Sequence, residues 1–173
     1  MTATKAIPVK RLLSAQAYQL IDREIAKYPA DQKQSAVMGA LTIAQDEVGW
    51  VSPAVIEDVA DYLSMPPIAV YEVATFYNMY NLEEVGTWKI GVCTCLPCAL
   101  REGDKAGEYL KQKLGIDYGE TTPDGRFTLI ETECLGSCAD APICLINDKR
   151  VESFMDNAKL DALIDELRNK ERH

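Results

Sequence analysis

The chain has 173 residues, of which 47% are hydrophobic and 26% are charged, and its net charge is −9. This composition is typical of a globular protein, and the negative charge argues against nucleic acid or an anionic membrane surface as a partner. No apolar stretch approaches the roughly 20 residues that a membrane-spanning helix needs, and no signal peptide is evident, so we expect a cytoplasmic protein.

Residues 1–85 are expected to form a bundle of helices. They contain no cysteine, and their apolar residues recur at helical spacing behind capping residues or prolines. The four expected helices cover residues 14–28, 31–50, 52–65 and 67–80. The last of them is crowded with aromatic and methionine side chains, most of which we expect to pack internally, while the rest could form a docking face. These side chains are Tyr71, Phe76, Tyr77, Met79 and Tyr80.

Residues 86–173 change to an α/β pattern in the order strand, helix, strand, strand, strand, helix. The strands are predicted at residues 87–93, 126–134, 142–148 and 150–154, and the helices at residues 97–114 and 156–170. A strand–helix–strand unit followed by a hairpin and a covering helix has the element order of thioredoxin. The sequence therefore predicts an α/β, thioredoxin-like second domain behind the helical bundle.

Two close pairs of cysteines stand out in this second half, Cys93 with Cys98 in CTCLPC and Cys134 with Cys138 in CLGSC. Each pair follows a predicted strand, and if the two strands are parallel neighbours their ends lie at one edge of the sheet. Gly136 can adopt a positive φ and so allow the second loop to turn tightly. Four thiolates on two short loops suit an iron–sulfur cluster or zinc.

Two other interpretations of the cysteines remain open at this point. Zinc ribbons usually use tighter CxxC spacing, so zinc fits poorly. A thioredoxin-type dithiol of Cys95 and Cys98 would leave the other close cysteines without a role. Cys144, in the apolar run PICLI, is expected to be a core residue, and Cys95 a thiol that binds no metal.

The segments TFYNMYN, CTCLPCALREG and ECLGSCADAPICLIND, at these distances from one another, resemble the small (E-chain) iron–sulfur subunit of NADH:quinone oxidoreductase, respiratory complex I. The resemblance covers most of the chain, from the helical part to the predicted hairpin. The same module also occurs in the diaphorase parts of NAD-linked hydrogenases and formate dehydrogenases.

The resemblance implies a thioredoxin-like ferredoxin domain that holds one [2Fe–2S] cluster, with Cys93, Cys98, Cys134 and Cys138 as ligands. It also implies a larger partner subunit that binds NADH and FMN, other iron–sulfur subunits beyond it, and electron transfer beside the flavin. The chain would then be part of a membrane complex, peripheral on the inner face of the cell membrane or on the matrix side in a mitochondrion. Cys95 and Cys144 lie outside the family pattern.

The reduction potential of such a cluster is expected to be low. The single histidine, His173, is the last residue of the sequence, which leaves no histidine near the cysteine pairs to raise the potential as in Rieske centres. Glu133 and Asp140 add negative charge beside the second pair, which disfavours the added electron.

Overall fold

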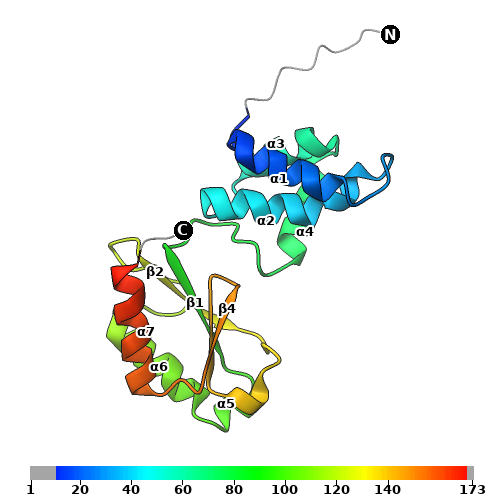
Figure 1. Cartoon of the computed structure of the whole chain (residues 1–173). Helices are drawn as coiled ribbons and strands as arrows, with labels where there is room; N and C mark the ends of the chain where they lie inside the picture. The colour runs from blue at the N-terminus through cyan, green and yellow to red at the C-terminus, as the bar shows by residue number, and fades with distance from the viewer. Residues whose placement is uncertain (1–10, 171–173) are drawn as a thin grey trace, which may run out of the picture. The chain divides into compact units, whose positions relative to one another are not determined.

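The computed structural model describes residues 11–170, which divide into two compact units with the boundary between Glu84 and Val85 (Figure 1). The first unit is helical, and the second combines a sheet with helices, as the sequence predicted. The assignment of two domains, residues 1–85 and 86–173, stays a prediction. His173 lies outside the described residues.

The first unit contains four α-helices and one 3₁₀ helix: α1 (Ala15–Ile25), η1 (Lys33–Ala36), α2 (Val37–Val48), α3 (Pro53–Leu63) and α4 (Pro67–Phe76). Serine side chains cap α1 and α3, because Ser14 accepts a hydrogen bond from the N–H of Ala17 and Ser52 accepts one from Val55. The expected helix at residues 31–50 instead begins with the 3₁₀ turn. No side chain accepts a capping hydrogen bond at the start of η1 or of α2.

The aromatic segment at the end of α4 differs from the expectation. Tyr80 is buried and Met79 half-buried, but Tyr71, Phe76 and Tyr77 are exposed. The prediction that most of these side chains pack internally is wrong, because Tyr71 and Phe76 lie on the exposed side of α4 and Tyr77 follows the end of the helix in an extended conformation. An apolar surface is left around α4.

The second unit is built on a four-stranded sheet in the order β2-β1-β3-β4. Its strands are β1 (Trp88–Cys93), β2 (Phe127–Thr132), β3 (Ile143–Ile146) and β4 (Arg150–Ser153). Strands β1 and β2 are parallel neighbours, which is the condition for the two cysteine pairs to share an edge, and the other pairs are antiparallel. The crossover from β1 to β2 makes their carboxyl ends meet at one edge of the sheet.

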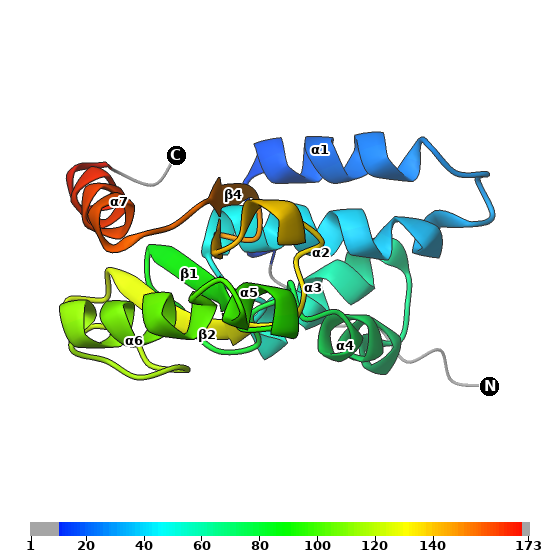
Figure 2. The same cartoon turned by 90° about the horizontal axis from the view of Figure 1, so that it is seen from below.

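Helices complete this unit: α5 (Leu96–Ala99), α6 (Gly103–Leu114), the 3₁₀ turn η2 (Cys138–Asp140) and α7 (Asn157–Asn169). The expected continuous helix at residues 97–114 is broken, because Glu102 adopts a left-handed conformation with φ of 69° between α5 and α6. Figures 1 and 2 show α6 and α7 side by side against one face of the sheet.

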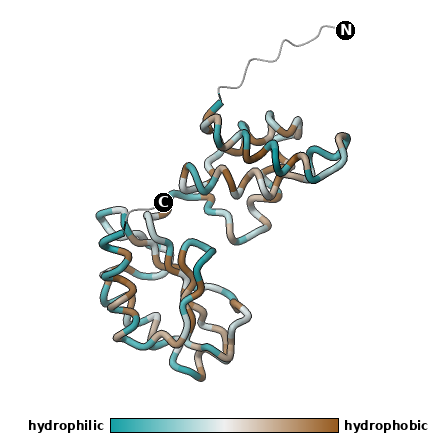
Figure 3. The backbone as a smooth tube through the Cα atoms, in the orientation of Figure 1, coloured by the Kyte–Doolittle hydropathy of each residue, from teal (hydrophilic) through white to brown (hydrophobic). Residues whose placement is uncertain are grey.

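The core of the second unit lies between that face and the two long helices. Strand residues Ile90 and Leu129 pack there with Leu110 of α6 and Ile164 of α7, all fully buried. Cys144 belongs to the same core, so the prediction that it is a core residue is confirmed. The hydrophobic colouring of the strands in Figure 3 follows this core.

Candidate metal centre

The register of β1 and β2 brings the two cysteine loops to one edge of the sheet. Cys93, the last residue of β1, is paired with Thr132, the last residue of β2. One loop continues from Cys93 into α5, and the other continues from Thr132 through Cys134 to η2. Both cysteine pairs therefore start from neighbouring strand ends, as the sequence predicted.

The first loop buries its pair of thiols. Cys93 and Cys98 are both fully buried, and they pack with Ala141 and Ile143, which precede and begin β3. Pro97 lies in the first turn of α5, and the N–H of Cys98 donates a hydrogen bond to the carbonyl oxygen of Cys95 at 2.8 Å. This tight helical turn directs the Cys98 thiol inward.

The second loop presents its thiols toward the surface. Cys134 is exposed and Cys138 half-buried, and their sulfur atoms lie 3.9 Å apart. Gly136 between them has a φ of 76°, the left-handed conformation that its sequence context allows. The site thus has one buried and one accessible pair.

Backbone N–H groups from both loops converge on Cys93. Burial raises the pKa of its thiol, but hydrogen bonds from the N–H groups of Cys95 and Leu135 and from neighbouring thiols outweigh burial, so the net pKa is lowered. Leu135 belongs to the second loop, so one sulfur atom receives hydrogen bonds from both. Such N–H···S bonds favour the thiolate that a metal binds.

The thiols of Cys98 and Cys138 resist ionisation because of burial and of the neighbouring thiols. Burial, followed by the hydrogen bond and charge of Cys93, raises the pKa of Cys98 to about 12. The hydrogen bond with Cys134, then burial, raises the pKa of Cys138. Because thiolates repel one another here, the set favours a positively charged metal centre that binds the deprotonated sulfurs.

Cys95 has the properties of a bystander rather than of a redox nucleophile. Its thiol lies 4.0 Å from a carboxylate oxygen of Glu133, and its pKa is raised, by burial first and then by the charges of Cys93 and Cys134. A thioredoxin-type nucleophile needs a lowered pKa. These features argue against the dithiol interpretation of Cys95 and Cys98.

The thiols are arranged as two pairs rather than around one point. Within residues 11–170, no three side chains of the metal-binding types are placed to hold a single ion. A mononuclear zinc site needs all its ligands around one ion, whereas a [2Fe–2S] centre takes two thiolates on each iron. The two thiol pairs, Cys93 with Cys98 and Cys134 with Cys138, supply the four thiolates that a two-iron group takes.

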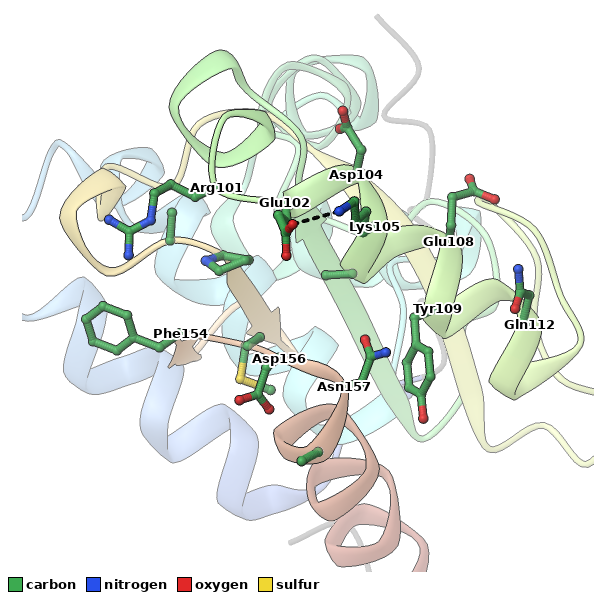
Figure 4. A pocket seen from close by; sticks show the side chains of 15 residues that line it. Arg101, Glu102, Asp104, Lys105, Glu108, Tyr109, Gln112, Phe154, Asp156 and Asn157 are labelled. Carbon is green, nitrogen blue, oxygen red and sulfur yellow. Dashed lines mark hydrogen bonds and ion pairs between the residues drawn. The ribbon is translucent and has the colours of Figure 1, made fainter.

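A pocket of about 820 Å³ lies beside the site, between α6 and the turn from β4 to α7 (Figure 4). Charged side chains of both signs line its rim, and Glu102 is paired there with Lys105 at 2.7 Å. None of the cysteines lines it. With no excess of positive charge, this pocket is a poor match for the phosphates of a nucleotide.

Comparison with known proteins shows the family of this chain. A family model described as thioredoxin-like [2Fe-2S] ferredoxin matches residues 21–168. The chain belongs to this ferredoxin family. Among relatives, the E-chain subunit of NADH-quinone oxidoreductase from Rickettsia bellii is 48% identical over 84% of this chain and 87% of its own length.

A more distant relative and a solved structure of similar fold extend the comparison. The mitochondrial NADH dehydrogenase [ubiquinone] flavoprotein 2 of Dictyostelium discoideum is 40% identical over 86% of this chain and 60% of its own. A crystal structure of an air-oxidised NAD⁺-reducing [NiFe]-hydrogenase matches with a TM-score of 0.69 and 22% identity over 82% of this chain. This chain spans 24% of that hydrogenase chain, and the likeness shows a shared fold.

Three residues that shape this ferredoxin site were not predicted from the sequence. Gly103, the first residue of α6, lies so close to the loop that a Cβ atom would be 2.9 Å from the carbonyl oxygen of Cys98. The hydroxyl of Thr94 donates a hydrogen bond to Glu131. A glycine at the start of a predicted helix could have indicated the first feature, but the second depends on strand register.

Proposed function

We propose that this chain is the electron-transfer subunit of the NADH dehydrogenase module of respiratory complex I, with one [2Fe–2S] cluster held by Cys93, Cys98, Cys134 and Cys138. The observation that carries the proposal is the convergence of two thiol pairs at neighbouring strand ends, in a member of a [2Fe–2S] family. The rickettsial oxidoreductase relatives support the parent complex, because they match along most of their length.

The residues around the site support one-electron transfer. The cluster, when bound, supplies a centre that gains and loses one electron. Ala141 and Ile143 exclude water from Cys93 and Cys98, while the exposed Cys134 side gives a partner's cofactor close access. The acidic side chains of Glu131 and Glu133 disfavour added negative charge, so we expect a low potential.

The partner in this proposal is a larger subunit of the same complex that binds FMN and NADH, followed by the other iron–sulfur subunits. Its docking face on this chain is the α4 patch, which we define as Ile68, Tyr71, Phe76 and Tyr77. All four side chains are exposed, and Phe76 is 79% exposed. Clusters of exposed aromatic side chains are more common at protein–protein interfaces than on the rest of a protein surface.

The proposed location is the inner face of the cell membrane, or the matrix side in a mitochondrion, where the chain is a peripheral part of the complex. Among the described residues, no helix is long and apolar enough to cross a bilayer. Attachment to the membrane would therefore depend on partner subunits for this part of the chain.

A second candidate is the equivalent subunit of an NAD-linked hydrogenase or of a formate dehydrogenase diaphorase. The structural likeness to the NAD⁺-reducing hydrogenase favours it, although that likeness shows the fold alone. Purification of the tagged chain from its native host, with partners identified by mass, separates the two. Quinone-reductase subunits support complex I, and hydrogenase subunits support the second candidate.

The ligand set is tested by replacing each of the six cysteines with serine in turn. We expect Cys93→Ser, Cys98→Ser, Cys134→Ser and Cys138→Ser to lose iron, sulfide and visible absorption. The matched controls Cys95→Ser and Cys144→Ser should keep all three. Loss of the chromophore in Cys95→Ser, together with its retention in Cys93→Ser or Cys98→Ser, would show that the assignment of ligands is wrong.

A further inference from the structure

A hydrogen bond joins the first cysteine loop to the end of β2, the strand from which the second cysteine loop leaves the sheet. Thr94 is the first residue after β1, and its hydroxyl donates to a carboxylate oxygen of Glu131 in β2 at 2.6 Å. That length is typical of a hydroxyl bonded to an ionised carboxylate, which is among the stronger hydrogen bonds in proteins.

The place of this bond follows from the strand register. Glu131 of β2 is paired with Val92 of β1, which is two residues before Thr94. The side chain of Glu131 spans the distance from this pair to the hydroxyl of Thr94. Thr94 lies between Cys93 and Cys95, and Glu131 lies three residues before Cys134. The bond therefore connects a residue next to the buried thiol pair with one just before the exposed pair.

Past the strand ends, the ladder hydrogen bonds that hold β1 and β2 together no longer act. Another side-chain contact between the loops is the approach of the Cys95 thiol to Glu133, which is long at 4.0 Å. The Thr94–Glu131 bond is much shorter, so we expect it to contribute more than that contact to the separation of the two thiol pairs.

We propose that Thr94 and Glu131 are positioning residues, whose hydrogen bond fixes the distance between the two loops and so the geometry of the four thiolates. This inference rests on the proposed [2Fe–2S] function. Glu131 has a second role, because its negative charge beside the site makes the cluster harder to reduce.

The test separates the hydrogen bond from the charge with three variants of the full chain. Thr94→Val removes the hydroxyl and keeps the shape, Thr94→Ser keeps the hydroxyl, and Glu131→Gln keeps an acceptor oxygen but removes the charge. For each, three properties are measured: iron loss to a chelator, the electron paramagnetic resonance spectrum of the reduced cluster, and the midpoint potential.

We expect Thr94→Val to lose iron about three to ten times faster than the wild type, as suits the loss of one hydrogen bond, and to have altered g-values. Thr94→Ser should keep the wild-type rate of iron loss and the wild-type g-values. Glu131→Gln should raise the midpoint potential, and more than Thr94→Val does. Combining Thr94→Val with Glu131→Gln should speed iron loss by less than the product of the two single effects.

Two controls match these changes. Thr75→Val removes a hydroxyl whose hydrogen bonds to the carbonyl oxygens of Tyr71 and Glu72 stay within α4, and it should leave the three properties unchanged. Glu133→Gln removes a neighbouring charge that contacts a thiol rather than a hydroxyl, and it should raise the potential without faster iron loss.

If the wild-type chain holds full iron and sulfide, and Thr94→Val has the same rate of iron loss and the same spectrum, this inference is wrong and the proposed function still stands. A wild-type chain without a [2Fe–2S] cluster would overturn the proposed function, and this inference with it.

Discussion

Asp58 on α3 is a fully buried carboxylate on which three donors converge. Its oxygens accept hydrogen bonds from the guanidinium of Arg11 at 3.0 Å, from the N–H of Leu12 at 3.3 Å and from the hydroxyl of Tyr18. These bonds attach the segment before α1 to α3. A buried charge that is paired in this way leaves its partners unsatisfied when it is removed.

Replacing Asp58 with alanine should therefore lower the free energy of unfolding by about 2–4 kcal/mol, measured by urea denaturation. The control Asp61→Ala removes a half-exposed carboxylate that pairs with the same Arg11 at 2.9 Å, and it should cost less than about 1 kcal/mol. Equal losses in the two variants would contradict the importance assigned to burial.

Tyr62 makes the stability of the helical unit depend on pH in the alkaline range. Burial, followed by the hydrogen bond that its hydroxyl donates to Asp22 at 2.6 Å, raises its pKa to about 12 from an ordinary value of 10.0. Because the pKa is higher in the folded protein, the neutral Tyr62 hydroxyl stabilises the folded state. This stabilisation is complete below pH 10 and is lost as pH rises toward 12.

We expect the free energy of unfolding to fall between about pH 10 and 12, with a shallower fall in Tyr62→Phe. The measurement is a series of denaturant titrations across this range. Tyr28→Phe, at an exposed tyrosine, is the control and should keep the wild-type slope. Identical slopes for Tyr62→Phe and the wild type would show that this hydroxyl is not responsible.

At the residue scale, the cysteines were the most predictable part of the site. Their spacing and their place after two strands predicted that Cys93 and Cys134 lie at one sheet edge, and the apolar run around Cys144 predicted its burial. The Thr94–Glu131 bond could not be predicted, because it depends on the pairing of Val92 with Glu131, which a sequence pattern does not determine.

At the scale of elements, the start of α6 supports the first cysteine loop. A Cβ atom on Gly103 would lie 2.9 Å from the carbonyl oxygen of Cys98 and 3.0 Å from that of Cys93. Both contacts are with backbone, which cannot move without moving the loop. Gly103 thus lets α6 pack directly against the carbonyl groups of two proposed ligands.

Gly103→Ala should push the loop away and lower stability by about 1–3 kcal/mol, with lower iron content after reconstitution. The measurements are denaturant unfolding and iron analysis of the same preparation. Gly39→Ala is the matched control, because its Cβ would meet only the flexible side chain of Glu24. If Gly103→Ala kept full iron and full stability, close packing at this helix start would be unimportant.

The elements themselves were predicted well where local signals exist. Ser52 marked the start of α3 correctly through its side-chain cap. The break between α5 and α6 was missed, because a glutamate carries no local signal for the left-handed conformation that Glu102 adopts. The helix at α4 was predicted four residues too long, because it ends at Phe76 and Tyr77 is extended.

At the scale of the whole molecule, the composition and element order predicted the fold class, but not the exposure of the α4 patch. Aromatic and methionine residues are usually buried, so a pattern cannot distinguish a core from a docking face. The exposed side chains of Ile68 and Phe76 are therefore information that only the structure provides.

Ile68→Asp should weaken co-purification of the chain with its flavin-binding partner several-fold, because a charge would be desolvated in the interface. The residue lies in the first turn of α4, where an acidic side chain favours the helix, so the folded chain should persist. The control Gln19→Asp adds the same charge on α1, outside the patch. Unchanged co-purification of Ile68→Asp would show that the docking face lies elsewhere.

The most direct measurement on the central claim is the iron and acid-labile sulfide content of the purified full-length chain. We predict about two irons and two sulfides per chain, both lost in Cys138→Ser and both kept in Cys144→Ser. Stoichiometric zinc, or iron without sulfide, in the wild-type chain would contradict the claim.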